Sequence, residues 1–181
     1  ALEAFCYSMK IIILGAGQVG RSLAENLAND ANDVTMVDQD AGYLKDLQDR
    51  LDIRTVKGHA CLPNILASAG AEDADMLVAV TNSDEINMVA CQIAKTMFQT
   101  PTIISRIREH QYLLKRDALF RDEPRAFPID VIISPEKLVT AHVQRLIENP
   151  TALQVLDFAK GKVQLVAVTA CHGGPLVGKP V

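Results

Sequence analysis

The sequence predicts an α/β fold: a Rossmann-like, doubly wound parallel sheet, followed by the start of a small α+β C-terminal subdomain that the chain truncates. Three observations predict it. Strand-like and helix-like segments alternate along most of the chain. The first apolar run leads directly into the pattern G-x-G-x-x-G and then into a helical stretch. The second apolar run ends on an acid, Asp38, about 20 residues beyond the glycines.

The expected strands are short runs rich in Ile, Val and Leu, which is typical of parallel strands covered on both faces. They are residues 10–14, 33–37, 53–57, 76–79, 102–107 and 127–132. Helices are expected between them at residues 18–28, 42–51, 62–69 and 83–98, with short irregular helix over 109–120. Asp130 interrupts the sixth strand, so we expect that strand at an edge of the sheet or at an oligomer contact.

A longer helix and a hairpin follow the predicted sheet. Ser134, Pro135 and Glu136 supply an N-cap, a first-turn proline and a first-turn acid, so a helix is expected over 134–148. Residues 153–159 and 162–169 then read as the first hairpin of a second module. We expect a longer natural protein beyond it. Residues 1–8 precede a plausible initiator, Met9, and fit no secretory signal, so we expect them to be an expression remnant outside the fold.

The glycine pattern predicts a dinucleotide site. Gly15 permits the tight strand-to-helix turn, Gly17 lets backbone approach a pyrophosphate, and Gly20 lets helix pack on strand. The helix N-terminus then offers N–H groups and partial positive charge to the phosphates. Asp38 is expected to accept hydrogen bonds from the adenosine ribose, and its charge disfavours a 2′-phosphate, so NAD is favoured over NADP. The alternative is a structural turn whose nucleotide site has been lost.

Polar residues follow other predicted strands at the same sheet edge, where ligands of open α/β sheets bind. Thr81 and Asn82 are expected to bond the ribose or phosphates, while the plainer interpretation is helix capping by Ser83. Gly58 is expected to leave room for the adenine. The next residue, His59, is either a neighbour of the base or an exposed loop histidine.

Two arginines end the fifth predicted strand. Alternation places Arg106 and Arg108 on one face, so one is expected to meet phosphate or ribose and the other a neighbouring subunit, unless both are surface residues. Cys61 has no convincing base beside it and is not expected to be a nucleophile. The cysteines form no C-x-x-C pair, which indicates reduced thiols rather than disulfides or zinc ligands; they are Cys6, Cys61, Cys91 and Cys171.

Composition and missing chemistry narrow the function. The 181-residue chain is 49% hydrophobic, carries a net charge of −4 and has only 4% aromatic residues. It therefore lacks a general attraction to nucleic acid and a base-stacking platform, and it has no apolar run near the ~20 residues of a membrane span. No histidine belongs to an acid/base constellation of the kind that hydride transfer needs. We expect no enzyme and no metal site, with the nucleotide as a regulatory ligand.

Several longer segments resemble one family. They are KIIILGAGQVG, VDQD, VKGHA, ADMLVAVTNSDEINMVACQIAK, RIR and ISPEKLV, between residues 10 and 139. They resemble the TrkA family of NAD-binding regulatory subunits of bacterial potassium uptake, built from domains of the RCK (or KTN) type. The resemblance implies an N-terminal nucleotide-binding subdomain over 9–133, a crossover helix over 134–150 and the beginning of a C-terminal subdomain over 151–181.

The resemblance also implies partners and a site. Family members form dimers and then a ring that docks on a membrane potassium-translocating subunit, at the cytoplasmic face of the inner membrane, and nucleotide binding reshapes the ring. The implied contacts of NAD or NADH are Gly15, Ala16, Gly17, Gln18 and Val19 at the pyrophosphate, Asp38 at the ribose, and Thr81, Asn82 and Arg106. Gly20 and Gly58 complete the expected set of cofactor-binding residues. His59 stands where many RCK domains have Asp, so no role of that Asp is carried over.

Two alternatives stay open. The chain is otherwise an ATP- or ADP-sensing RCK domain of another potassium channel or efflux system, or the cofactor half of an NAD-dependent dehydrogenase.

Overall fold

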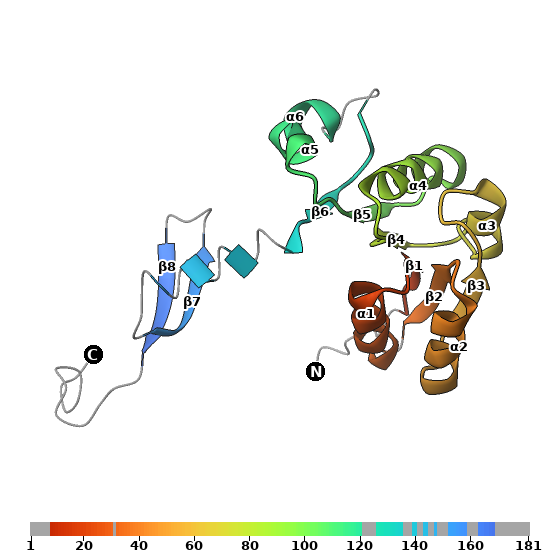
Figure 1. Cartoon of the computed structure of the whole chain (residues 1–181), viewed down its shortest axis with the longest axis horizontal. Coiled ribbons are helices and arrows are strands. Elements are labelled where there is room, and N and C mark those ends of the chain that lie inside the picture. Colours follow the sequence, from red (N-terminus) through yellow and green to blue (C-terminus); the bar gives the residue numbers. More distant parts are fainter. Residues whose placement is uncertain are drawn as a thin grey trace, which may run out of the picture. The chain divides into compact units, whose positions relative to one another are not determined.

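Six short strands form one parallel sheet in the order β3-β2-β1-β4-β5-β6, which confirms the predicted Rossmann-like sheet (Figure 1). They are β1 (Lys10–Leu14), β2 (Asp33–Asp38), β3 (Arg54–Lys57), β4 (Met76–Ala79), β5 (Thr102–Arg106) and β6 (Val131–Ile133). The computed structural model describes residues 8–30, 32–120, 126–135, 139–140, 143–144, 147, 152–158 and 163–168. The chain divides into two compact units, Ala1–Ser134 and Pro135–Val181.

Helices cover both faces of the sheet (Figure 1). They are α1 (Gln18–Asn29), α2 (Ala41–Arg50), α3 (Pro63–Ser68), α4 (Asp84–Phe98), α5 (His110–Leu114) and α6 (Arg116–Leu119). The buried side chains of α1 and α2 share one hydrophobic cluster, and those of α3 and α4 share the other. Every sequence-predicted helix between the strands is present, with bounds that differ by one residue or so at each end.

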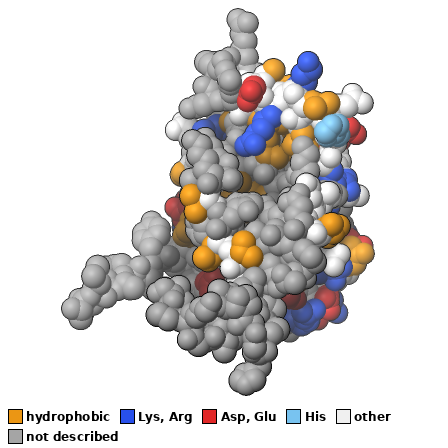
Figure 2. Space-filling model, turned by 90° about the vertical axis from the view of Figure 1, so that its left-hand side faces the viewer, with side chains coloured by type: hydrophobic (Ala, Val, Ile, Leu, Met, Phe, Trp, Pro, Cys, Tyr) orange, Lys and Arg blue, Asp and Glu red, His pale blue; other side chains and the backbone are white. Residues whose placement is uncertain are grey.

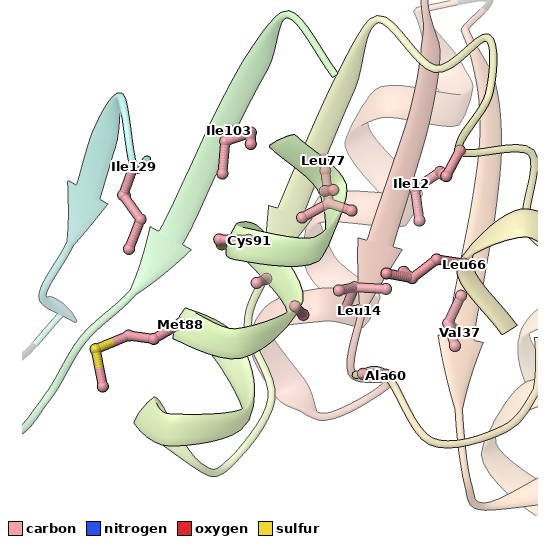
Figure 3. Packing of buried hydrophobic residues seen from close by; sticks show 14 of the residues in the cluster. Ile12, Leu14, Val37, Ala60, Leu66, Leu77, Met88, Cys91, Ile103 and Ile129 are labelled. Carbon is pink, nitrogen blue, oxygen red and sulfur yellow. The ribbon is translucent and has the colours of Figure 1, made fainter. Parts of the chain in front are cut away.

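The sequence of β1 explains why the sheet is covered twice. Ile11 and Ile13 belong to the cluster under α1 and α2, whereas Ile12 and Leu14 belong to the cluster under α3 and α4. All four are at most 2% exposed, because a strand alternates its side chains between two faces and both faces are buried here. Figure 3 shows Ile12 and Leu14 in one layer with Leu77 and with Cys91 of α4.

The sixth strand differs from its prediction. It lies at an edge of the sheet, as expected, but it begins at Val131 rather than at residue 127. Pro128 has no N–H to give to a ladder, and the Ile129 N–H bonds back to the Phe127 carbonyl at 2.9 Å. Residues 127–130 therefore form an irregular approach, and only three residues pair with β5.

The second unit contains the hairpin that the sequence predicts. Strands β7 (Ala152–Phe158) and β8 (Val163–Val168) pair antiparallel. Before them, the described residues 135, 139, 140, 143, 144 and 147 are helical, as expected for the helix over 134–148. The rest of that helix and the segment 169–181 lie outside the described residues, as do residues 1–7 of the expected N-terminal remnant.

Some features of the surface and of the thiols bear on function. Figure 2 shows acidic, basic and hydrophobic side chains interspersed on the described surface that faces the viewer. No helix within the described ranges is long and apolar enough to cross a bilayer. Cys61 and Cys91 are free thiols, while Cys6 and Cys171 lie outside the described residues.

Candidate nucleotide-binding site

A cavity of about 350 Å³ lies at the carboxyl ends of the central strands. This is the edge at which open α/β sheets bind ligands, and the volume is within the usual range for a small-molecule pocket. Its lining comes from β2 and β5, the turns that follow the strands, and the first turns of α1, α2 and α4. The lining residues are Gly15, Gly17, Gln18, Val19, Val37, Asp38, Gln39, Tyr43, Gly58, Ala60, Val80, Thr81, Asn82, Ile86 and Arg106.

The three glycines of the turn have different physical reasons. Gly15 has a φ of 104°, and a Cβ on it would lie 2.9 Å from the Thr81 backbone. A Cβ on Gly20 would lie 1.9 Å from the Gly15 carbonyl oxygen, so this glycine lets α1 approach the turn. A Cβ on Gly17 would meet no atom within 4 Å, so the fold itself does not require a glycine there. Gly17 lines the cavity, where a Cβ would occupy space that a phosphate needs.

The start of α1 lacks a side-chain cap. Gly17 is its N-cap residue and contributes no side-chain hydrogen bond, whereas Asp40 caps α2 and Ser83 caps α4. The first-turn N–H groups of a helix need an acceptor from outside it, and an anion at this end also meets the positive end of the helix dipole. The residues therefore fit a phosphate at the opening turn of α1.

Asp38 connects this turn to α2. Its Oδ2 accepts from the Ala16 N–H at 2.6 Å, and its Oδ1 accepts from the Asp40 N–H at 2.8 Å. A carboxylate has about four acceptor positions, so each oxygen keeps capacity for a ribose hydroxyl. Asp38 lines the cavity and is partly exposed. Its geometry therefore suits a ribose as well as the loop it braces.

The opposite wall is built around a buried amide. Asn87 is 0% exposed; its Oδ1 accepts from the Thr81 N–H at 3.0 Å and from the Thr81 hydroxyl at 2.7 Å. Its Nδ2 donates to the Arg106 carbonyl at 3.0 Å. The Thr81 hydroxyl is thus used inside the protein, while the exposed Asn82 stands at the cavity rim. Ser83 does cap α4, accepting from the Ile86 N–H at 3.2 Å.

Arg106 and Arg108 have different surroundings at the end of β5. Arg106 lines the cavity, whereas the Arg108 guanidinium donates to the Asn82 carbonyl and lies 3.9 Å from Asp84. The strand stops at Arg106, so its alternation does not extend to Arg108. The alternation argument therefore applies to Arg106 alone, and Arg108 is not a lining residue of the cavity.

The loop after β3 corrects one further expectation. The turn from His59 to Leu62 brings the Cys61 Sγ to 3.1 Å from the His59 Nδ1, so a base does stand beside Cys61. Gly58 lines the cavity, but a Cβ on it would lie 2.5 Å from the Ile65 side chain. Its absence of a side chain therefore serves the packing of α3 as well as the space in the cavity.

Hydrogen bonds shift the pKa of two groups near the start of α4. The Ser83 hydroxyl, and then Tyr112, lower the pKa of Glu85. The same contact with Glu85 raises the pKa of Tyr112, whose hydroxyl donates to Glu85 at 3.1 Å. Within the described ranges, no group of three His, Cys, Asp or Glu side chains is placed to hold a metal ion.

A protein-family model described as the TrkA-N domain matches residues 11–135. The chain belongs to the TrkA-N family. Curated relatives named "Trk system potassium uptake protein TrkA" are 62% identical over 94% of the chain in Halomonas elongata and 59% identical over 94% in Vibrio alginolyticus. The chain spans 37% of the length of each of these relatives.

Solved structures share the TrkA-N fold at low identity. The TrkA-N domain of the Escherichia coli inner membrane protein ybaL has a TM-score of 0.67 at 17% identity, covering 78% of this chain and 98% of that one. The GsuK channel bound to NAD has a TM-score of 0.60 at 18% identity, covering 84% and 26%. The Kef C-terminal domain of Shewanella denitrificans in its AMP-bound form has a TM-score of 0.57 at 18% identity, covering 77% and 81%.

Most of the site residues that the sequence predicts line one cavity of the TrkA-N domain, and two do not. Ala16 and Gly20 are not lining residues: Ala16 is fully buried and holds Asp38 through its N–H, and Gly20 packs against Gly15. Sequence reasoning missed the other lining residues, which are Val37, Gln39, Tyr43, Ala60, Val80 and Ile86. Their signal was position alone, since each lies at or shortly after the carboxyl end of a strand or in the first turn of the following helix.

Tyr43 also has an unpredicted neighbour. The Arg21 guanidinium of α1 lies 4.3 Å from the centre of the Tyr43 ring, and its Nε donates to the Ala16 carbonyl at 2.9 Å. A cation over an aromatic face is a favourable contact. The pair therefore links α1 and α2 beside the glycine turn of the TrkA-N domain.

Proposed function

We propose that this TrkA-N domain binds NAD or NADH and serves as the nucleotide-sensing part of a regulatory subunit for potassium uptake. The observation that carries the binding proposal is Asp38, which lines the cavity while its carboxylate braces the glycine turn at Ala16. The uncapped start of α1 supports it, because it offers the donors that a pyrophosphate would take.

In the proposed complex, each part of the dinucleotide contacts a different wall of the cavity. The turn from Gly15 to Val19 faces the pyrophosphate, with Gly20 and Ala16 supporting it from behind. Asp38 takes the adenosine ribose, and its charge disfavours the 2′-phosphate of NADP. Gly58 lies on the adenine side. Thr81, Asn82 and Arg106 close the opposite wall, with Arg106 supplying positive charge for phosphate.

The link to potassium rests on the relatives' names. The Halomonas and Vibrio proteins are Trk system potassium uptake proteins, and this chain spans 37% of their length. We propose that the whole subunit docks, as a homodimer or larger ring, on a membrane potassium-translocating partner at the cytoplasmic face of the inner membrane. Gating then requires the nucleotide to bind two assembly shapes with different affinity, since equal affinity shifts nothing.

The same proposal divides the chain into a nucleotide-binding subdomain over 9–133, a crossover helix over 134–150 and the beginning of a C-terminal subdomain from 151. The helix would transmit a change at the cavity to the parts that contact the partner.

Adenine mononucleotides are the second candidate ligands. The Kef domain is solved in an AMP-bound form, and GsuK is solved bound to ADP as well as to NAD. Isothermal titration of the purified protein with NADH, NAD, ATP and ADP separates the candidates. We expect NADH or NAD to bind more tightly than ATP or ADP, and the reverse order would replace the dinucleotide with a mononucleotide.

Asp38→Ala tests the site assignment. Losing a hydrogen bond to a charged group costs about 1.5–3 kcal/mol, so NADH affinity should fall about tenfold or more. Asp33→Ala is the matched control, because Asp33 is an aspartate at the other end of the same strand, at its amino end. Its affinity should stay within about twofold of the parent. Equal affinities in the two variants would refute the assignment.

We also propose that the domain is not an enzyme. Following NADH absorbance with hydroxy acids, aldehydes and amino acids should give a flat trace. Turnover that Gly17→Val abolishes would show that the cavity is instead the cofactor half of a dehydrogenase.

A further inference from the structure

Asp84 is a buried acid that helix capping does not explain. It is 6% exposed and begins α4, yet Ser83 already caps that helix. Its Oδ2 accepts from the N–H groups of Arg108 at 2.8 Å and Glu109 at 2.7 Å. Its Oδ1 makes no hydrogen bond among the described residues and lies 3.9 Å from the Arg108 Nε. A buried carboxylate is costly without such partners, so its contacts with this backbone are specific.

Asp84 contacts the backbone just beyond Arg106, the last residue of β5 and a lining residue of the cavity. Strand β5 ends at Arg106, and the next residues leave the sheet toward α5. Asn87 holds the Arg106 carbonyl, the Ile133 carbonyl accepts from the Ile107 N–H at 3.0 Å, and Asp84 holds the two residues that follow. The backbone is thus fixed at four successive residues, starting with Arg106, which lines the cavity.

We propose that Asp84 is a positioning residue for the nucleotide site, acting through Arg106. This inference rests on the proposed function. Asp84 does not line the cavity, so it acts on the ligand only through the segment it holds. Without its carboxylate, two N–H groups lose their acceptor and the exit from β5 can pivot about Arg106. The guanidinium then loses its fixed place against the phosphate or ribose, where a small displacement costs much of the interaction.

A double-mutant cycle on NADH affinity tests this, using the whole chain. We expect Arg106→Ala and Asp84→Ala each to weaken binding about fivefold or more, within the range of coupled neighbours. In the Arg106→Ala background, Asp84→Ala should change affinity by less than about twofold, because its target is already gone. Asp84→Asn should recover most of the affinity, since an amide oxygen can still accept from both N–H groups.

A second pair of variants reaches the same contact from the backbone side. Glu109 has a φ of −63°, which proline adopts without strain, so Glu109→Pro removes one N–H donor to Asp84. Glu109→Ala keeps that N–H and removes only the side chain that caps α5. We expect Glu109→Pro to weaken NADH binding severalfold in the parent and not in the Arg106→Ala background, while Glu109→Ala stays near the parent. If Asp84→Ala does not fold, these two Glu109 variants still test whether the contact with Asp84 acts on NADH binding through Arg106.

Thr100→Val is the control for general destabilisation. Thr100 is 1% exposed and bonds the Ala94 carbonyl at the other end of α4, so its loss should lower stability and leave affinity unchanged. Equal losses from Asp84→Ala in both backgrounds, or unchanged affinity in a folded Asp84→Ala protein, would overturn the inference alone. A parent that binds none of the nucleotides, or an Asp38→Ala protein that binds like the parent, would overturn the proposed function and this inference with it.

Discussion

At the scale of single residues, Gly17 and Gly20 allow an effect on nucleotide binding to be distinguished from an effect on stability. A Cβ at residue 17 enters open space in the cavity, whereas a Cβ at residue 20 lies 1.9 Å from a backbone oxygen. Gly17→Ala should change the free energy of unfolding by no more than about 0.5 kcal/mol and weaken NADH binding about tenfold or more. Gly20→Ala should destabilise the protein by more than about 2 kcal/mol. Thermal melts beside titrations check both, and a Gly17→Ala protein that binds normally would contradict a phosphate at this turn.

The two described thiols should react differently. Cys61 is half-buried beside His59, while Cys91 is 0% exposed and burial raises its pKa to about 12. In a variant with Cys6 and Cys171 replaced by Ser, Ellman's reagent at pH 8 should label one thiol in the folded protein and two in urea. Cys61→Ser should remove the fast label and Cys91→Ser should not. Fast labelling of both thiols would show that α4 opens readily.

The same thiol predicts a response to alkaline pH. The folded state keeps the Cys91 proton up to about pH 12, while an unperturbed thiol ionises near 9.0. The folded state therefore holds more protons across this window, and the free energy of unfolding should fall as pH rises from about 9 toward 12. Urea titrations at pH 8 and 10 should show a smaller difference for Cys91→Ala than for the parent. An equal difference would mean that other groups cause the loss.

Sequence reasoning found the residues whose role follows from a local pattern. Gly15, Gly17 and Asp38 were predictable because a strand, a turn and a second strand place them in one short unit. Asn87 and Asp84 were not, because their partners at Arg106, Arg108 and Glu109 lie 19 to 25 residues away along the chain, at the end of β5 and just beyond it. In the sequence, both look like ordinary polar residues of a helix. Their binding role stays a prediction until the titrations are done.

At the scale of elements, the start of β6 depends on one side chain. The Asp130 Oδ2 accepts from the Ile103 N–H at 2.7 Å, and the Asp130 N–H donates to the Ile103 carbonyl at 2.9 Å. The Asp130 carboxylate thus accepts a hydrogen bond from a backbone N–H of β5, as a backbone carbonyl does elsewhere in the sheet. Asp130→Ala should lower the free energy of unfolding by about 1.5–3 kcal/mol, and Asp130→Asn by less, since its amide oxygen can still accept. Urea unfolding checks both, and equal losses in the two variants would assign the effect to the charge of Asp130 and not to its acceptor oxygen.

The elements themselves were mostly predictable from hydrophobic pattern. Strands β1, β2, β4 and β5 are short, mostly apolar runs with buried residues, so composition and length agree on them. The sixth strand was harder, since residues 127–130 have the apolar content of a strand but contain Pro128 and Asp130. Pairing there is decided by hydrogen-bond geometry, which apolar content does not report.

For the whole molecule, the helix of the second unit suggests self-association. Val139, Val143 and Ile147 are 62%, 48% and 73% exposed and stand four residues apart, on one face. A row of exposed apolar side chains usually meets a partner, and the proposed assembly makes a second copy the expected one.

Light scattering of Val139→Glu/Ile147→Glu tests this contact. The parent should be a dimer, and the double variant should be a monomer because two charges would be buried in the interface. Met97→Glu is the control, since Met97 is 58% exposed on α4 and should leave the dimer intact. A monomeric parent, or a dimeric double variant, would remove this helix as the contact.

The strand order also divides the cavity between two lengths of chain. Residues before Gly70 supply β1 to β3 and the walls at Gly15, Asp38 and Gly58, while residues after it supply β4 to β6 and the walls at Thr81 and Arg106. The halves meet where β1 pairs with β4. If the chain were cut near Gly70, the nucleotide would act as a bridge between two fragments. Fragment complementation would then report the nucleotide concentration directly, as a reassembled protein in place of two pieces.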